Sequence, residues 1–378
     1  MNQLGESSLH EHFNDLPDPR INRHKRHELA DLLIIAICAM ICGADGWVQI
    51  QQFGQSKLNW FKTFLTLPNG IPSHDTFGRV FAALDPVAFE KCFANWVNSL
   101  RADNANDLIA IDGKTLRRSF DHASGKTALH MVSAWAADCR LTLGQVATEQ
   151  KSNEITAIPK LLELLDISGA TVTIDAMGCQ KQIAEQIIAQ EGDYMLGLKG
   201  NQGTMHDEVK LLIDDAVEHD FAHMPYDFHE TVEGDHGRIE HRKVWCTHEV
   251  EWFKEKDQWP GLRSFVMVES QRTVGDKTTC ERRYFISSLD GTNAKRAGHA
   301  IRSHWGIENS VHWILDVAFD EDRCRVRQAN AAQNISLLRR LALNMLKNES
   351  TLNVGIKTKR LRAGWDEQYL LNVLKSPN

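Results

Sequence analysis

The chain has 378 residues, long enough for two or three domains with a sizeable core. Its 42% hydrophobic and 25% charged content is typical of a folded globular protein and excludes a disordered chain. The net charge of −7 alone would argue against a nucleic-acid partner. However, ten Lys or Arg residues lie between Arg323 and Arg362 against one acid, Glu349, so an acidic chain still carries a basic region.

Residues 1–100 have the apolar spacing of several short helices. A basic stretch and the apolar run 32–42 resemble a signal peptide, but the run is shorter than the ~20 residues that a membrane span needs. We interpret it as a buried helix over 28–42 and expect a cytoplasmic protein. Ser73 is a predicted N-cap, and Pro86 is predicted in the first turn of the next helix. This region fits a helix-turn-helix-like module or a plain helical bundle.

The pattern changes near residue 107. Three strands are predicted at 108–112, 128–137 and 141–148, with a hairpin between the last two. They are followed by a helix (155–166), a buried strand (171–176), a helix (180–190), a fifth strand (193–199) and a helix (204–217). This order of elements predicts a mixed α/β sheet covered by helices.

Residues from about 225 to 290 interrupt this order. Three stretches there have strand patterns, and we interpret the segment as a β-rich insertion. Two long helices are predicted after it, over 293–319 and 329–347. The eight cysteines show no CxxC spacing, which favours structural thiols in a reducing cytosol over zinc ligands or disulfides.

Two apolar runs end on an acid in the same way. LIAID ends on Asp112 and TVTID on Asp175, in the first and fourth predicted strands, which could be neighbours in the sheet. Two carboxylates at adjoining strand ends repel each other unless a cation lies between them. Each Asp alone could instead be a turn-forming residue that caps the next segment.

A third acid, Glu308, lies in the predicted helix 293–319. The helix has a predicted apolar stripe formed by Ile301, Trp305, His312, Leu315 and Phe319. Glu308 falls on the same stripe, and a buried Glu needs a partner. The partner is either a core histidine, His304 or His312, or a metal ion. A glycine inside a helix, such as Gly306, lowers helix stability by about 1 kcal/mol. Its presence would be explained if a metal or a substrate backbone came close there.

Three carboxylates on a mixed sheet suit a two-metal phosphodiester site, because Mg²⁺ binds through a few carboxylates and a substrate phosphate. Basic side chains after Asp112 would then hold phosphates that the ions do not neutralise; they are Lys114, Arg117 and Arg118.

Two further segments are candidates for DNA contact. Lys199 and Asn201 follow a strand at the same edge and belong either to a DNA contact or to a solvated loop. The run 357–362 is either a set of solvated charges or a phosphate-binding tail, and the basic excess favours the tail.

Seven segments together resemble the DDE transposases of bacterial insertion sequences, and most closely the H-repeat-associated proteins found with Rhs elements. The segments, in the expected order, are KRHELADLL, AIDGKTLRRS, KSNEI, TIDAMGCQ, YMLGLKGNQ, DHGRIEHR and RSHWGIENSVHWILDVAFDEDRCRVR. They span roughly residues 15 to 345, which is nearly the whole chain.

The resemblance implies an organisation and an activity. It implies an N-terminal all-helical DNA-recognition region (1–100), an RNase-H-like α/β catalytic core with the β-rich insertion (101–350) and a basic C-terminal tail (351–378). It also implies that Asp112, Asp175 and Glu308 form the catalytic, metal-binding triad, with two Mg²⁺ ions and Mn²⁺ as a substitute. The activity would be DNA strand cleavage and strand transfer by a homo-oligomer on double-stranded DNA, away from any membrane.

The sequence departs from the related transposases at one signature. They carry Tyr, Arg, Glu and Lys in the spacing Y-x2-R-x3-E-x6-K, and the corresponding positions here are Ile301, His304, Glu308 and Leu315. The phosphate contacts of that Arg and Lys therefore do not carry over, and His304 and Arg302 are candidate replacements. A catalytically silent DNA-binding remnant and a stand-alone metal-dependent nuclease are the alternative functions.

Overall fold

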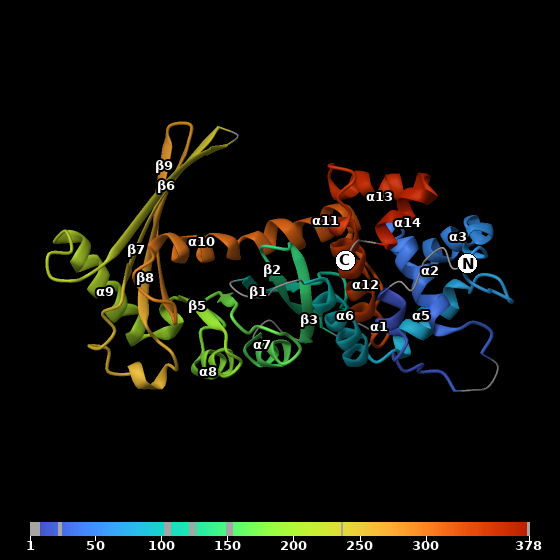
Figure 1. Cartoon of the computed structure of the whole chain (residues 1–378), viewed down its shortest axis with the longest axis horizontal. Helices are drawn as coiled ribbons and strands as arrows, with labels where there is room; N and C mark the ends of the chain where they lie inside the picture. The colour runs from blue at the N-terminus through green and yellow to red at the C-terminus, as the bar shows by residue number, and fades with distance from the viewer. Residues whose placement is uncertain are drawn as a thin grey trace.

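The computed structural model describes residues 8–21, 25–101, 107–120, 125, 127–148, 154–235 and 237–375. Residues 151–153, part of the KSNEI motif, lie outside these ranges. Figure 1 shows the N-terminal helices packed with the C-terminal ones at one end of an elongated molecule and long paired strands at the other.

Among the described residues of the N-terminal region there are six helices. They are α1 (Ser8–Phe13), α2 (Leu29–Ile41), α3 (Trp47–Ser56), α4 (Leu58–Phe61), α5 (His74–Ala83) and α6 (Pro86–Leu100). The expected buried helix is confirmed, because α2 is buried along almost its whole length. Ser73 Oγ accepts a hydrogen bond from the Thr76 amide (3.3 Å), and Pro86 opens α6, as predicted. Within the described parts of the chain, no helix is long and apolar enough to cross a membrane.

Five strands of the part of the chain that the structure describes form the core of the sheet. They are β1 (Leu108–Thr115), β2 (His130–Ala136), β3 (Leu141–Thr148), β4 (Thr171–Ile174) and β5 (Asp193–Leu198). Their spatial order is β3-β2-β1-β4-β5, in which β1, β4 and β5 run parallel and β2 and β3 are antiparallel to their neighbours. This is the mixed sheet that the order of elements predicted, with the RNase-H-like organisation that the resemblance implied. The runs LIAI and TVTI are fully buried, because they are central parallel strands with both faces covered.

Helices cover both faces of this sheet. Helices α7 (Glu154–Leu162) and α8 (Lys181–Ala189) lie on one side, and α10 (Ala294–His304) crosses the other side above β1, β4 and β5 (Figure 1). Helix α9 (Thr204–Glu218) packs against β9, and the buried helix α12 (Ala331–Asn348) joins β3 to α2, α5 and α6. All eight cysteines are free thiols.

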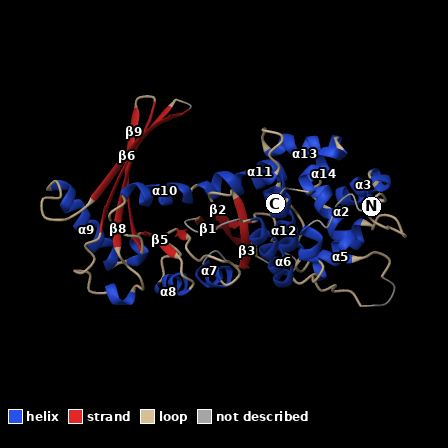
Figure 2. Ribbon diagram, viewed as in Figure 1, coloured by secondary structure: helices blue, strands red, loops and turns tan. Residues whose placement is uncertain are grey.

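The β-rich insertion continues the same sheet. It contains β6 (Asp227–Asp235), β7 (Arg238–Thr247), β8 (Ser264–Val274) and β9 (Lys277–Ser287), and β9 pairs with β5. Figure 2 shows these strands as a long arm beyond the core. The insertion is confirmed, but the sequence predicted three strands and missed β6. Strand β6 is at the edge of the sheet and has the acidic sequence DFHETVEGD, which lacks an apolar face.

The segment after residue 350 forms helices rather than an extended tail. Helices α13 (Ile356–Trp365) and α14 (Glu367–Leu374) pack against α2 and α12. Within the basic run, Lys359 is buried and donates to the Leu346 carbonyl (2.9 Å), and Arg360 donates to the Met40 carbonyl (2.9 Å). The prediction of a phosphate-binding tail is therefore wrong for these two side chains, because they bind main-chain carbonyls inside the protein.

Candidate active site

Asp112 lies where β1 and β4 separate. Strand β1 does not end at Asp112, as the sequence suggested, but continues to Thr115 by pairing with β2, where Ser133 lies opposite Asp112. The parallel pairing of β1 with β4 ends at Ile111 and Ile174. Asp175 directly follows Ile174, so the two aspartates occupy equivalent positions on neighbouring strands, as expected.

Glu308 lies in an irregular part of the helix that follows the insertion. Helix α10 ends at His304, and the π-helical turn η4 (Glu308–His312) leads into α11 (Trp313–Phe319). The side chain of Glu308 is 53% exposed and Trp305 is 47% exposed, whereas His312 is buried. The prediction that Glu308 lies on a buried stripe is wrong, because the helix departs from 3.6 residues per turn at Trp305 and over η4.

Gly306 allows this helix to approach the sheet. A Cβ atom at residue 306 would lie 2.5 Å from Cη2 of Trp135, a buried side chain on β2. The glycine is therefore explained by an indole ring that packs against the helix, and not by the metal or substrate backbone that the sequence suggested.

Asp112, Glu308 and His312 form one cluster. The three side chains offer ligand atoms that all lie within 4.8 Å of one another. The His312 Nδ1 atom is 3.5 Å from Asp112 Oδ2 and 3.5 Å from Glu308 Oε2. Burial raises the pKa of Asp112 to about 6, and the charges of Glu308 and Asp175 add to this effect, whereas His312 opposes it. His312 lowers the pKa of Glu308. The Asp112 side chain is 21% exposed, and such a half-buried carboxylate with further acids around it is a suitable ligand for a divalent cation.

Asp175 borders this cluster without belonging to it. Its side chain is exposed, and Oδ1 accepts a hydrogen bond from the Met177 amide (3.0 Å), which is the turn-capping contact considered from the sequence. Its charge nevertheless contributes to the raised pKa of Asp112. Asn201, a predicted DNA contact, donates to the Ala176 carbonyl (2.8 Å) and so holds the turn that carries Asp175.

Lys114 does not face solvent as a phosphate ligand would. Its ammonium group donates to Asp316 and to Glu321 Oε2 (3.2 Å). Glu321 is buried and also accepts from Arg340 Nη1 (3.3 Å). Burial alone would raise the pKa of Glu321, but the charges of Arg340 and Lys114 outweigh it and hold this pKa at about 2. The predicted DNA contact of Lys114 is therefore replaced by an ion-pair network that fastens α11 to β1.

The basic residues around the cluster differ in their availability. Arg118 and Lys199 are exposed. Arg117 is 79% exposed, with Nε 3.2 Å from Asp322. At the surface, such an ion pair contributes little stability and leaves the guanidinium available to another anion.

The two candidate replacements for the missing signature residues have partners within the protein. Arg302 is half-exposed and donates to Glu233 of β6 (3.1 Å). The Nδ1 atom of His304 lies 3.1 Å from Thr173 Oγ1, and burial lowers the pKa of His304. The ring of His304 therefore faces β4, and the structure does not support it as a phosphate ligand.

A basic cleft lies between the N-terminal helices and the core. It has a volume of about 530 Å³ and is lined by Arg79 of α5 and by Arg325 and Arg327, which precede α12. The sequence indicated the basic excess after residue 323, but it gave no reason to single out Arg79. Two other basic residues of that excess, Arg339 and Arg340, are buried.

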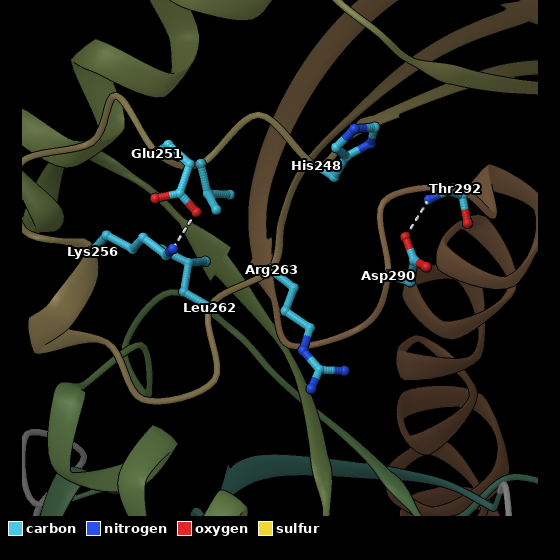
Figure 3. Close-up of a pocket in the computed structure, with 8 residues that line it drawn as sticks. His248, Glu251, Lys256, Leu262, Arg263, Asp290 and Thr292 are labelled. Atoms are coloured by element: carbon cyan, nitrogen blue, oxygen red, sulfur yellow. Dashed lines mark hydrogen bonds and ion pairs between the residues drawn. The ribbon is translucent and has the colours of Figure 1, made fainter.

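A second hollow lies at the base of the insertion (Figure 3). Its volume is about 520 Å³, and its lining includes Lys256, Arg263 and Asp290 but none of the three predicted acids. Lys256 is paired with Glu251, and Asp290 accepts a hydrogen bond from the Thr292 amide (3.1 Å). These contacts make it a polar surface hollow, separate from the acidic cluster.

Comparisons with known proteins agree on one family. Residues 103–345 match the model described as a transposase DDE domain, and residues 10–97 match the model described as DDE_Tnp_1-associated. The chain is 40% identical over 371 residues to "H repeat-associated putative transposase YhhI" of Escherichia coli (strain K12), with 97% of each chain covered. It is 42% identical over 373 residues to "Putative transposase YncI" of Escherichia coli O157:H7, covering 98% of this chain and 95% of the relative.

Among solved structures, the chain has a distant similarity to a piggyBac transposase synaptic complex with hairpin DNA. The TM-score is 0.40 and the sequence identity 10%, and the match covers 100% of this chain and 79% of that chain.

Proposed function

Because this chain belongs to the DDE transposase family, we propose that it cuts DNA at the ends of a mobile element and transfers the strands to a target. Asp112, Asp175 and Glu308 are the proposed catalytic acids. The observation that carries this proposal is the meeting of Asp112 with Glu308 at the point where β1 and β4 separate, with Asp175 at the adjacent strand end.

The same acids are the proposed ligands of two Mg²⁺ ions, for which Mn²⁺ would substitute. The fit rests on carboxylate donors, which hard cations prefer, and on the burial that raises the pKa of Asp112 to about 6. When bound, the ions would activate the attacking hydroxyl and stabilise the leaving oxygen. The protein itself positions these ligands, since the Lys114 network holds the helix of Glu308 and Asn201 holds the turn of Asp175.

The proposed partner is double-stranded DNA, bound by a homo-oligomer. Arg117 and Arg118, which follow β1, and Lys199, which follows β5, are exposed, and Arg79 and Arg325 line the basic cleft. Arginines and lysines in such positions attract phosphates whatever the base sequence. We assign recognition of the element ends to residues 1–100, because α5 contributes Arg79 to that cleft.

The test is a cleavage and joining assay on labelled duplexes that carry the inverted repeats flanking the gene, with a supercoiled plasmid as target. Asp112→Ala, Asp175→Ala and Glu308→Gln should abolish cleavage and joining in Mg²⁺ and in Mn²⁺ while gel-shift binding persists. Glu251→Gln, an exposed acid of the insertion, serves as the control and should retain both activities.

The outcomes separate the alternatives. Full cleavage by any one of the three variants would contradict the assignment of the acids. Cleavage by the wild-type protein without joining would indicate a stand-alone nuclease. Binding without cleavage would indicate a silent remnant of a transposase.

A further inference from the structure

His312 is a buried imidazole beside the acids that the proposed chemistry does not require. It is 3% exposed and lies at the end of the π-helical turn that begins with Glu308. Its Nε2 atom is buried and has no hydrogen-bond partner among the described residues. Its Nδ1 atom faces two carboxylates at once. A π-helical turn is rare and is frequently found at functional sites, which makes its position here informative.

The distances around Nδ1 are long for a hydrogen bond and fit ligands arranged around one ion. Nδ1 lies 3.5 Å from an oxygen of Asp112 and 3.5 Å from an oxygen of Glu308. A hydrogen bond would bring one of these oxygens to about 2.7–3.2 Å. Two ligands at right angles on one cation, each ~2.1 Å from it, lie about 3 Å apart. Nδ1 is therefore equally far from the two oxygens. This distance is about half an ångström longer than the distance between two ligands of one ion.

We propose that His312 Nδ1 is a nitrogen ligand of the divalent cation held by Asp112 and Glu308, an inference that rests on the proposed function of these two acids. Asp175 is left as an oxygen ligand on the neighbouring strand. The donor set at this cation is then two carboxylates and one imidazole, and not carboxylates alone.

This donor set changes which cation the site prefers. Mg²⁺ takes oxygen ligands almost exclusively, and an imidazole in its place weakens binding. Imidazole suits first-row transition metals, and affinity for a site of given ligands rises from Mn²⁺ onward along that series. The site should therefore bind Mn²⁺ more tightly than Mg²⁺, and His312 should be the cause.

The experiment uses the full chain without DNA and Mn²⁺ as the probe. Continuous-wave electron paramagnetic resonance measures Mn²⁺ affinity, and competition with Mg²⁺ gives the ratio of the two affinities. Pulsed measurement of electron spin echo modulation detects a nitrogen bound directly to Mn²⁺. The wild-type protein should show a ¹⁴N imidazole signal, and labelling with [¹⁵N]histidine should replace it. The labelling result needs no variant, so it stands even if a substitution impairs folding.

The matched variants identify the imidazole. His312→Asn places an amide oxygen near the position of Nδ1, so the nitrogen signal should disappear and the preference for Mn²⁺ over Mg²⁺ should fall by about tenfold or more. His299→Asn, an exposed position on α10, should change neither quantity. His304→Asn tests the other nearby imidazole and should also preserve the signal.

The results separate failure of the inference from failure of the proposed function. Mn²⁺ that binds without a nitrogen signal, or a signal that survives His312→Asn, overturns the inference and leaves the acid site intact. A signal lost in His304→Asn but kept in His312→Asn also overturns it. If Mn²⁺ does not bind the wild-type protein, or binds Asp112→Asn equally well, the proposed acid site fails together with the inference.

Discussion

Replacing Gly306 by alanine tests the packing of the helix that carries Glu308 against the sheet. The new Cβ atom would lie 2.5 Å from Cη2 of Trp135, and Trp135 is 4% exposed, so its ring has no space to move into solvent. At an ordinary helical position this substitution stabilises a protein by about 1 kcal/mol. Overpacking a core costs about 1–3 kcal/mol. The obstacle here is a rigid ring, so the upper half of that range applies, and the net loss should be about 1–2 kcal/mol.

Urea unfolding followed by circular dichroism measures this loss, and a double-mutant cycle assigns it. Trp135→Phe removes the part of the indole that meets the new Cβ. In that background Gly306→Ala should cost nothing or should stabilise the protein. Gly200→Ala is the control, because a Cβ added there meets no atom within 4 Å. Cleavage by Gly306→Ala should fall with stability, because displacement of the helix moves Glu308 away from Asp112.

The reasoning is refuted if Gly306→Ala is as stable as the wild-type protein and cleaves DNA equally well. It is also refuted if the loss persists unchanged in the Trp135→Phe background, since the indole could not then be its cause.

Three further predictions concern the buried network, a helix end and the basic cleft. Glu321→Gln should lower the free energy of unfolding at pH 7 by about 3 kcal/mol, because the pKa of Glu321 is held at about 2 instead of 4.5 in the folded protein. Since the pKa of Glu321 is lower in the folded protein, this stability is present above pH 4.5 and is lost as the pH falls towards 2. The free energy of unfolding of the variant, measured with urea, should therefore not show this loss between pH 4.5 and 2. A variant with the same pH profile as the wild-type protein would contradict the prediction. Ser73→Ala should cost about 1 kcal/mol in the same assay through loss of the α5 cap, and no change would mean that the cap is unimportant. Arg325→Ala should weaken binding to DNA of any sequence and reduce the slope of log K against log salt by about 1 in fluorescence anisotropy, whereas a loss confined to one sequence would indicate a base contact.

The core of the fold was predictable because its signals are local. Runs such as LIAI and TVTI are apolar on both faces, and this pattern predicts central strands whatever strands they pair with. Strand β6 was missed because none of its described side chains from Asp227 to Gly234 is buried. Its sequence therefore lacks the alternation of apolar and polar residues that predicts a strand. Strand β1 was predicted to end too early because its last residues are polar and pair with β2 through contacts such as that between Thr115 Oγ1 and His130 Nδ1 (2.9 Å).

Asp112 and Asp175 were predictable from the ends of two apolar runs and Glu308 from a predicted helix, but the partners of the basic side chains were not predictable. Lys114 follows Asp112 in a basic run, and such a run is the pattern expected of phosphate contacts. Its partner Glu321 lies 207 residues away along the chain, so nothing local distinguishes an internal ion pair from a DNA contact. The same holds for Arg360, whose acceptor at Met40 is 320 residues away.

The departure from the related signature has a structural explanation in the helix of Glu308. Leu315 occupies the lysine position of the Tyr-Arg-Glu-Lys signature, and it is 0% exposed and packs in the core, so a charged side chain there would not face the acids. His312, three residues earlier, is the helix residue that does face both Asp112 and Glu308. A regular 3.6-residue pattern places His312 on the core stripe, where it was one of the predicted partners of Glu308 beside a metal ion. The π-helical turn puts its Nδ1 between two carboxylates, and on this arrangement rests our proposal that the site prefers Mn²⁺.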